Sequence, residues 1–214
     1  MGHAGYWVDN AEHLLHFGGR AFPCDREIIA DASWKNHVLL LSADTDCLSL
    51  WDEDGLIRTA RAGLYPQGMA VQKDTAYVCG GADGKLHLLS LPALHETAEF
   101  MLPGMPEQVC PHGTHIYVLS LLSEPEVHAA LLRLSPDTGL HVEIFRFSGI
   151  PGALAAAQQG LWVGVSEFVF RLPWEANTPD VRVEGISLPG HIEVQPEGVI
   201  VTDTLEGRRY YIRT

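Results

Sequence analysis

Several features that define large classes of proteins are scarce or missing in this chain of 214 residues. No apolar run approaches the ~18 residues that a membrane-spanning helix needs. The longest runs, such as Val38–Leu41, have the length of a strand. Residues 1–9 contain neither the basic region nor the apolar region of a secretory signal. We therefore expect a cytoplasmic protein that does not enter a membrane.

Positive charge is also scarce, because 14 Lys and Arg residues stand against 27 Asp and Glu residues, a formal net charge of −13. A nucleic-acid-binding surface needs basic side chains that neutralise phosphates, and docking on anionic lipid needs them as well. The composition therefore argues against nucleic acid and against a membrane surface as partners.

Cysteine is rare, and the spacings of Cys24, Cys47, Cys79 and Cys110 (23, 32 and 31 residues) match no zinc or thioredoxin-like motif. We expect reduced thiols. The chain also lacks a glycine-rich phosphate loop and a complete nucleophile elbow. The pairs His13/His16 and His112/His115 have a spacing of three, which places side chains of a strand on opposite faces. The sequence therefore predicts no cofactor and no metal site.

Glycine and proline are plentiful, with 21 and 13 residues, as expected of a chain built from many short segments. One pattern recurs: an apolar run, a short polar turn, and a second apolar run. The first runs start at residues 37, 76, 115, 160 and 198, so the steps are 39, 39, 45 and 38 residues. Asp83-Gly84 is the clearest of the hairpin turns, because this dipeptide favours the positive φ angles of a type I′ turn.

Each hairpin is preceded by a run of small or moderate side chains and followed by a further strand. The preceding runs are residues 28–32, 68–72, 108–111, 153–157 and 192–195. Small side chains suit strands that crowd around a common axis. The repeating unit is thus four short antiparallel strands, named a to d in chain order, in about 40 residues, which is the size of a β-propeller blade.

The segments at the second strand resemble the YVTN repeats of YncE-like β-propellers. The matches are Tyr77-Val78-Cys79-Gly80, Tyr117-Val118-Leu119-Ser120, Trp162-Val163-Gly164-Val165 and Ile200-Val201-Thr202-Asp203. Trp51-Asp52 is similar to the Trp-Asp pair that ends strand c in WD40 repeats. The resemblance covers nearly the whole chain and implies an all-β propeller, but propellers have many unrelated functions.

The repeats predict a single domain over residues 1–214 with five four-stranded antiparallel blades. The last repeat stops after its third strand, so we expect His13–Phe17 to pair there as the fourth strand and remove an open edge. The alternative is a sixth blade that begins with a hairpin of Tyr6–Asn10 and Glu12–Phe17.

The b–c turns and the d–a connections of a propeller lie on one face, and here that face is acidic and partly aromatic. Such a rim would attract a basic peptide or protein patch by electrostatic steering. The alternative is that acidic turns serve only solubility. The predicted binding residues on the loop face and at the channel mouth are Asp44, Asp46, Tyr65, Gln67, Asp83, Glu107, Glu126, His191 and Glu193.

These features favour a non-catalytic binding or scaffolding propeller for a protein or small ligand. The alternative is a carbohydrate-active or lactone-type hydrolase, which the resemblance allows because five-bladed propellers include glycoside-processing enzymes. Glu27, Glu107 and Glu193 are then the candidate channel-mouth carboxylates, of which two would need different pKa values. Such enzymes are usually longer than this chain, so we favour the binding module. A homo-oligomer is a third possibility, and the sequence leaves the oligomeric state open.

Overall fold

The computed structural model describes residues 5–176 and 178–213, which form 22 β-strands. The strands make six antiparallel sheets of three or four strands, and the described residues contain no helix. Accordingly, nothing in the described part is a helix of the length and hydropathy needed to cross a membrane. The all-β class predicted from the sequence is confirmed.

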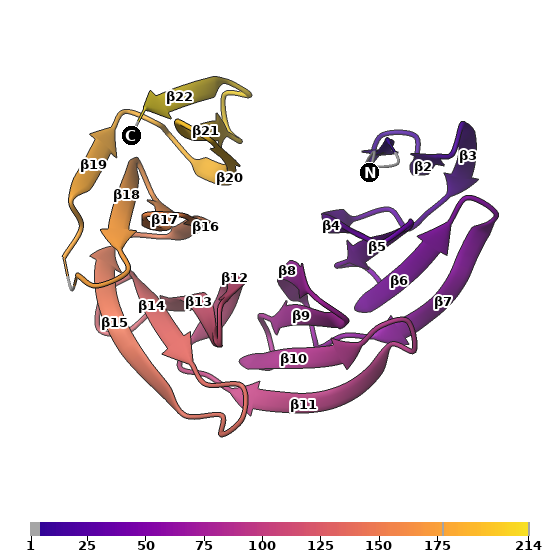
Figure 1. Cartoon of the computed structure of the whole chain (residues 1–214), viewed down its shortest axis with the longest axis horizontal. Coiled ribbons are helices and arrows are strands. Elements are labelled where there is room, and N and C mark those ends of the chain that lie inside the picture. Colours follow the sequence, from indigo (N-terminus) through magenta and orange to yellow (C-terminus); the bar gives the residue numbers. More distant parts are fainter. Residues whose placement is uncertain (1–4, 177, 214) are drawn as a thin grey trace. The chain divides into compact units, whose positions relative to one another are not determined.

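The chain divides into two compact units, residues 1–105 and residues 106–214. The first unit holds three sheets, drawn in indigo to magenta in Figure 1. They consist of β1 (Tyr6–Asp9), β2 (Leu14–Phe17) and β3 (Arg20–Pro23); β4 (Ile28–Trp34), β5 (His37–Ser42), β6 (Cys47–Asp52) and β7 (Gly55–Arg61); and β8 (Pro66–Gln72), β9 (Thr75–Gly80), β10 (Lys85–Ser90) and β11 (His95–Met101).

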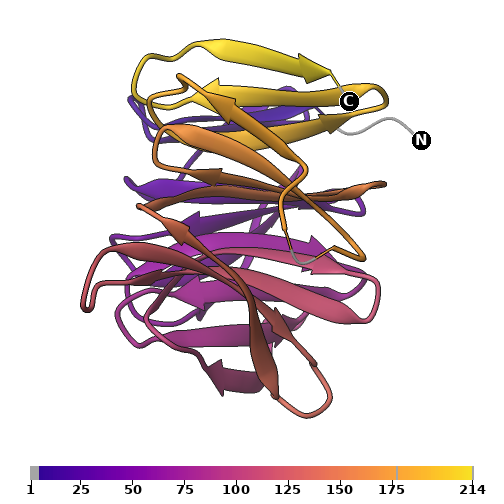
Figure 2. The same cartoon turned by 90° about the vertical axis from the view of Figure 1, so that its left-hand side faces the viewer.

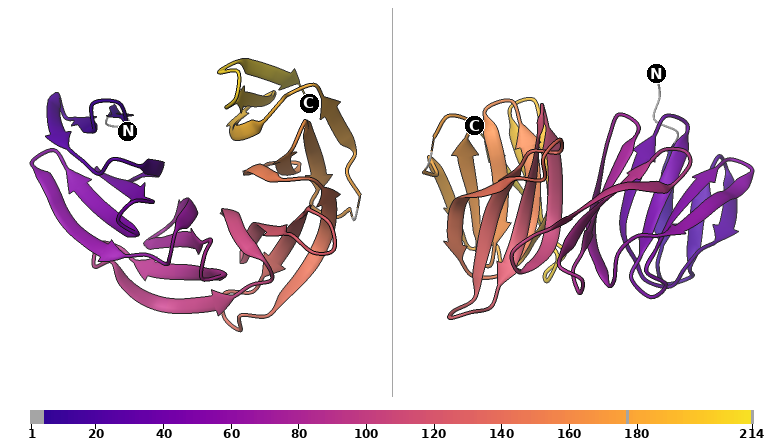
Figure 3. Two further views of the ribbon diagram at one scale, coloured as in Figure 1. Left: turned by 180° about the vertical axis from the view of Figure 1, so that it is seen from behind. Right: turned by 90° about the horizontal axis from the view of Figure 1, so that it is seen from below.

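The second unit also holds three sheets, which lie face to face in Figures 2 and 3. The boundary between the units falls at the first residue of β12. The strands are β12 (Met105–His112), β13 (His115–Leu122), β14 (His128–Leu134) and β15 (His141–Ser148); β16 (Pro151–Ala157), β17 (Gly160–Val165), β18 (Phe168–Pro173) and β19 (Val181–Glu184); and β20 (Pro189–Gln195), β21 (Gly198–Asp203) and β22 (Arg209–Arg213).

The middle strands of the sheets are buried on both faces. In β5, Leu39 and Leu41 pack into the core shared with the β8–β11 sheet, and the alternate residues Val38 and Leu40 pack toward the β1–β3 sheet. The second unit repeats this arrangement: Leu161 and Val163 of β17 pack with the β12–β15 sheet, and Trp162 packs with the β20–β22 sheet. Burial on both faces explains why these strands are continuous apolar runs rather than alternating ones.

The innermost strands agree with the prediction from small side chains. Residues 153–157, although rich in the helix-forming residue alanine, form strand β16 and pair with β17. Tertiary packing thus overrides local propensity here, because the segment is the first strand of a sheet that is packed between neighbours.

The prediction of five blades closed by the N-terminal strand was wrong: the described residues form six sheets, in agreement with the alternative of a sixth blade that begins with an N-terminal hairpin. β2 pairs with β1 and β3 in a sheet of its own, not with β22. Two local turns explain this. Gly18 and Gly19, with φ of 58° and 77°, form a two-residue turn between β2 and β3, and Asp9 accepts the N–H groups of the turn that joins β1 to β2.

Replacement of Leu119 by alanine tests the burial of the middle strands. Leu119 is fully buried in the core between the β12–β15 and β16–β19 sheets, so Leu119→Ala is expected to lower the free energy of unfolding by about 2–5 kcal/mol. The measurement is urea denaturation. Leu140, which is 74% exposed, is the control, and an equal loss in Leu140→Ala would contradict the assignment of the core.

Candidate functional site

At one edge of the sheets, the b–c turns and the d–a connections are joined by a repeated backbone hydrogen bond. The N–H group that follows strand b donates to the carbonyl group of the residue near the start of strand a. We call this edge the loop edge. Its bonds run from Ala43 to Glu27, from Gly81 to Tyr65, from Ser166 to Ile150 and from Thr204 to Leu188.

In the first unit, two of the predicted acidic residues also hold this edge through their side chains. Asp46 accepts the N–H of Tyr65 at 2.8 Å, and Asp83 accepts the N–H of Leu64 at 3.1 Å. The connection between β7 and β8 is therefore fixed from both neighbouring sheets. These two carboxylates have a structural role, in addition to any attraction for a ligand.

The second unit uses the same arrangement with different residues. Asp203 is fully buried and accepts the N–H groups of Ser187, Leu205 and Glu206 at 2.8–3.1 Å. Desolvation acts to raise the pKa of Asp203, but the hydrogen bonds from Glu206, Ser187 and Leu205 outweigh it and hold the pKa below its usual value. The hydroxyl of Ser166 has the corresponding position in the middle sheet and accepts the N–H of Ile150 at 2.9 Å.

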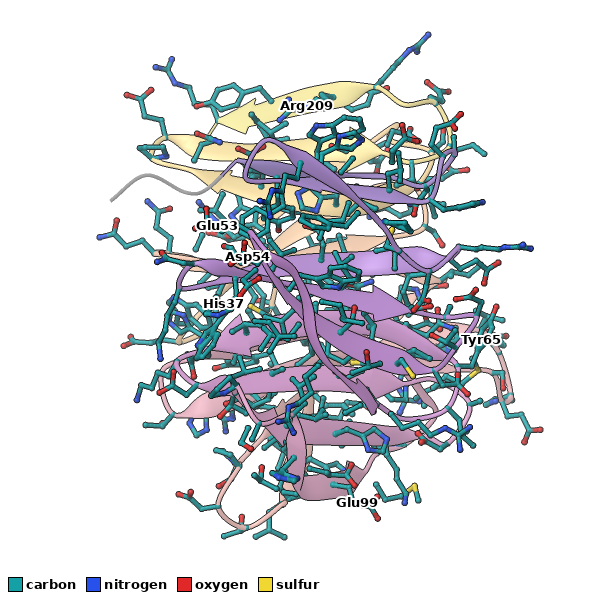
Figure 4. The ribbon with its side chains drawn as sticks, turned by 90° about the vertical axis from the view of Figure 1, so that its right-hand side faces the viewer. His37, Glu53, Asp54, Tyr65, Glu99 and Arg209 are labelled. Carbon is teal, nitrogen blue, oxygen red and sulfur yellow. The ribbon has the colours of Figure 1, made fainter. Side chains whose placement is uncertain are left out.

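Tyr65 is the most prominent side chain of the loop edge in the first unit. It is 56% exposed and has a φ of 48°, in the left-handed region. Beside it lies a groove of about 390 Å³. Figure 4 shows Tyr65 at the edge opposite to Glu53 and Asp54. The groove is lined by Asn10, Arg26, Glu27, Ile28, Ile29, Ala43, Tyr65, Pro66 and Gln67.

Two further predicted residues belong to this region. Gln67 lines the groove and donates to the carbonyl of Tyr65 at 3.4 Å. Asp44 is exposed on the turn between β5 and β6, and the hydrogen bond from the Ser42 hydroxyl holds its pKa below the usual value. In the first unit, the structure thus gathers Asp44, Asp46, Tyr65, Gln67 and Asp83 on one edge.

The predicted residues of the second unit occupy separate environments. Glu107, on β12, is half-buried, and desolvation raises its pKa. Glu193, on β20, is bound by Arg209 at 2.7 Å and by Gln195 at 2.6 Å. Glu126 and His191 are exposed. Glu193 is thus held in an exposed ion pair with Arg209.

The sequence-based list omitted several groove residues. Ile29 lines the groove and is 42% exposed, and Asn10 and Arg26 line it from the N-terminal segment. Outside the groove lining, Leu64 next to Tyr65 is also exposed, at 45%, although large apolar side chains are usually buried. Their positions in the sequence could have pointed to the loop edge. Arg26, Ile29 and Leu64 lie near the start of a strand a, and Asn10 lies in the hairpin of the first sheet. Together with Tyr65, the two apolar side chains make the loop edge amphipathic rather than only acidic.

Replacement of Asp203 by asparagine tests the structural role of these carboxylates. The folded-state pKa of Asp203 is lowered, so its stabilising effect is present above the unfolded-state value of ~3.9 and is lost as the pH falls through the folded-state pKa. Asp203→Asn should therefore be less stable than the wild type at neutral pH, and the difference should shrink in acid. Urea denaturation at neutral and acidic pH measures it. Asp137→Asn, at an exposed turn, is the control, and the same pH dependence of stability in wild type and Asp203→Asn would contradict this role.

Solved structures similar to this chain are β-propellers, whereas no family model and no curated protein sequence matches it. BamB from Moraxella catarrhalis is 11% identical, with a TM-score of 0.69 over 95% of this chain and 67% of its own. The β-propeller domain of Swd1 from Myceliophteria thermophila is 8% identical, with a TM-score of 0.64 over 83% of this chain and 63% of its own. The Pan2 WD40 domain of Neurospora crassa is 13% identical, with a TM-score of 0.60 over 99% and 78%. The chain therefore spans about two thirds of the length of the first two structures, and it has the β-propeller fold.

Proposed function

We propose that this chain is a non-catalytic binding module that receives a peptide segment or protein surface at the loop edge of its first unit. The partner carries basic and apolar side chains. The observation that carries the proposal is Tyr65, an exposed aromatic side chain held in a left-handed backbone conformation beside a groove.

The conformation of Tyr65 has an energetic cost that the surrounding structure offsets. A left-handed conformation costs a residue other than glycine about 1 kcal/mol or more. Of the seven described residues other than glycine that have a positive φ, Tyr65 is the one that lines the groove. Here Asp46 accepts the N–H of Tyr65, and the carbonyl of Tyr65 accepts the N–H of Gly81. The ring is thus presented on a fixed backbone, as in the rigid aromatic anchors of binding interfaces.

Charge at the loop edge supports a basic partner. Asp46 and Asp83 are hydrogen-bonded to the backbone, whereas Glu27, which lines the groove, and Asp44, next in the chain to the groove residue Ala43, are exposed to solvent. The net charge of the chain, −13, adds a long-range attraction for cations. Arg26, which also lines the groove, favours a partner that brings at least one acidic or carbonyl group near it.

The fold of the similar structures is compatible with this proposal and does not specify a ligand. One of them is described as a WD40 domain and another as a β-propeller domain. Because a fold serves many functions, the proposal depends on the residues of the loop edge. The hydrolase alternative has weaker support: burial raises the pKa of Glu107, but no neighbouring carboxylate contributes to that shift, as a catalytic pair of acids would.

Selection from a displayed library of random peptides tests the proposal, with the purified full chain as bait. We expect the selected peptides to be enriched in Lys, Arg and apolar residues, and their affinity to fall as salt rises from about 0.05 to about 0.5 M. Tyr65→Ala should weaken binding about 30-fold, equivalent to ~2 kcal/mol, because an anchor residue is lost. Fluorescence anisotropy of a labelled selected peptide provides the affinities.

Matched variants separate the loop edge from general charge effects. Glu27→Lys and Glu53→Lys change the net charge equally, but only Glu27 lines the groove, and Glu53 lies at the opposite edge (Figure 4). Glu27→Lys should weaken binding and Glu53→Lys should not. Tyr211→Ala, at another exposed tyrosine, is the control for Tyr65→Ala. Selected peptides without basic residues, or equal binding by Tyr65→Ala and Tyr211→Ala, would rule the proposal out.

A further inference from the structure

His87, Glu96 and Glu99 bring one imidazole nitrogen and two carboxylates together in the β8–β11 sheet. The candidate ligand atoms of these three residues all lie within 4.8 Å of one another. His87 lies on β10 and is 5% exposed, whereas both glutamates lie on the outer strand β11 and are exposed. From this geometry we propose a Zn²⁺ site with His87, Glu96 and Glu99 as ligands, distinct from the loop-edge groove.

A β-bulge creates the ligand set. Residues three apart in a regular strand face opposite sides of the sheet. Here His87 pairs with Glu99 and Leu89 pairs with Glu96, while the register shifts between Leu88 and Leu89, so Thr97 is the extra residue. Glu96 and Glu99 therefore lie on the same face as His87.

The orientation of the His87 ring is fixed by its surroundings. Its Nε2 atom lies 3.0 Å from Oδ2 of Asp83, and its Nδ1 atom lies 2.5 Å from Oε1 of Glu96. A Cβ atom added to Gly63 or to Gly80 would lie 3.0 Å from Nε2, so the ring is packed closely between these two glycines. A metal-binding histidine commonly donates its other ring N–H to a carboxylate. Asp83 has this role at Nε2 of His87, which leaves Nδ1 for the metal.

The chemistry of these ligands suits a first-row divalent ion. Imidazole nitrogen with carboxylate oxygen is a common donor set for zinc, with bond lengths near 2.0–2.2 Å, and three protein ligands leave one position for water. Ligand atoms of a tetrahedral zinc ion lie about 3.3 Å apart. The separation between Nδ1 of His87 and Oε1 of Glu96, 2.5 Å, would therefore lengthen, and the other separations, all within 4.8 Å, would contract by at most about 1.5 Å. The exposed side chains of Glu96 and Glu99 allow this movement.

Two other four-stranded sheets lack this set at the corresponding positions. Ser49, Leu56 and Thr59 occupy them in the β4–β7 sheet, and Ala130, Glu143 and Arg146 occupy them in the β12–β15 sheet. There Arg146 binds Glu143 at 2.6 Å, which shows that these outer-strand positions reach one another. In the β8–β11 sheet, the only cation in contact with the cluster among the described ion pairs is Lys85, whose Nζ lies 2.7 Å from Glu99.

Titration of the full chain with Zn²⁺ by calorimetry, and with Co²⁺ by visible absorption, tests the site. We expect one equivalent to bind, and Glu96→Gln and Glu99→Gln each to weaken that binding by about 100-fold. Lys85→Met should tighten it by about threefold, because a competing ammonium group is removed from Glu99. Glu143→Gln, the matched glutamate of the β12–β15 sheet, should bind as the wild type does.

A structural role alone for the cluster predicts a different result. If Asp83 and Glu96 only hold the His87 ring, the Glu96→Gln and Glu143→Gln variants will bind Zn²⁺ with the same affinity as the wild type, or no variant will bind it. Either result would overturn the proposal. Anomalous scattering at the zinc edge from crystals soaked in Zn²⁺ locates the ion directly, and a peak away from Nδ1 of His87 would overturn it as well.

Discussion

Packing of a middle strand between two neighbouring sheets, as seen for β5 in the first unit and for β17 in the second, is the constraint on which the rest of this structure depends. It makes β5 and β17 apolar on both faces, and among the described residues buried polar side chains on the inner strands are few, with Ser49, His87 and Ser120 among them. The two candidate sites lie at the loop edge and where the buried His87 of β10 meets the outer strand β11. The groove beside Tyr65 lies at the loop edge. The cluster around His87 joins the buried strand β10 to the exposed outer strand β11.

Acidic residues have two different roles at the loop edge. Asp46, Asp83 and Asp203 accept backbone N–H groups of neighbouring connections, and they make the edge rigid. Glu27 and Asp44 remain exposed to solvent. Charge patterning in a sequence does not separate these roles, because the difference lies in which carboxylates meet a donor from another sheet. The rigid edge in turn allows Tyr65 to keep its unusual backbone conformation.

Most strands were predictable, and the errors have specific causes. Apolar runs located the middle strands, and the small residues 153–157 were assigned to a strand against their helical propensity. The N-terminal sheet was only the alternative prediction, because residues 13–17 were paired by spacing with the end of the chain. The Gly18-Gly19 turn and the capping role of Asp9 instead specify local hairpins. A local turn signal thus gave better information than a count of residues between repeats.

The sequence by itself determined the strand periodicity, the approximate repeat length and the acidic character of the turns, since these depend on local composition and on residues near one another in the chain. Tertiary structure decided which side chains meet. Tyr65 and Asp46 are 19 residues apart, and His87, Glu96 and Glu99 converge only because a bulge at Thr97 changes the face on which a side chain lies. Bulges and contacts between sheets depend on packing, which no local pattern of residues specifies.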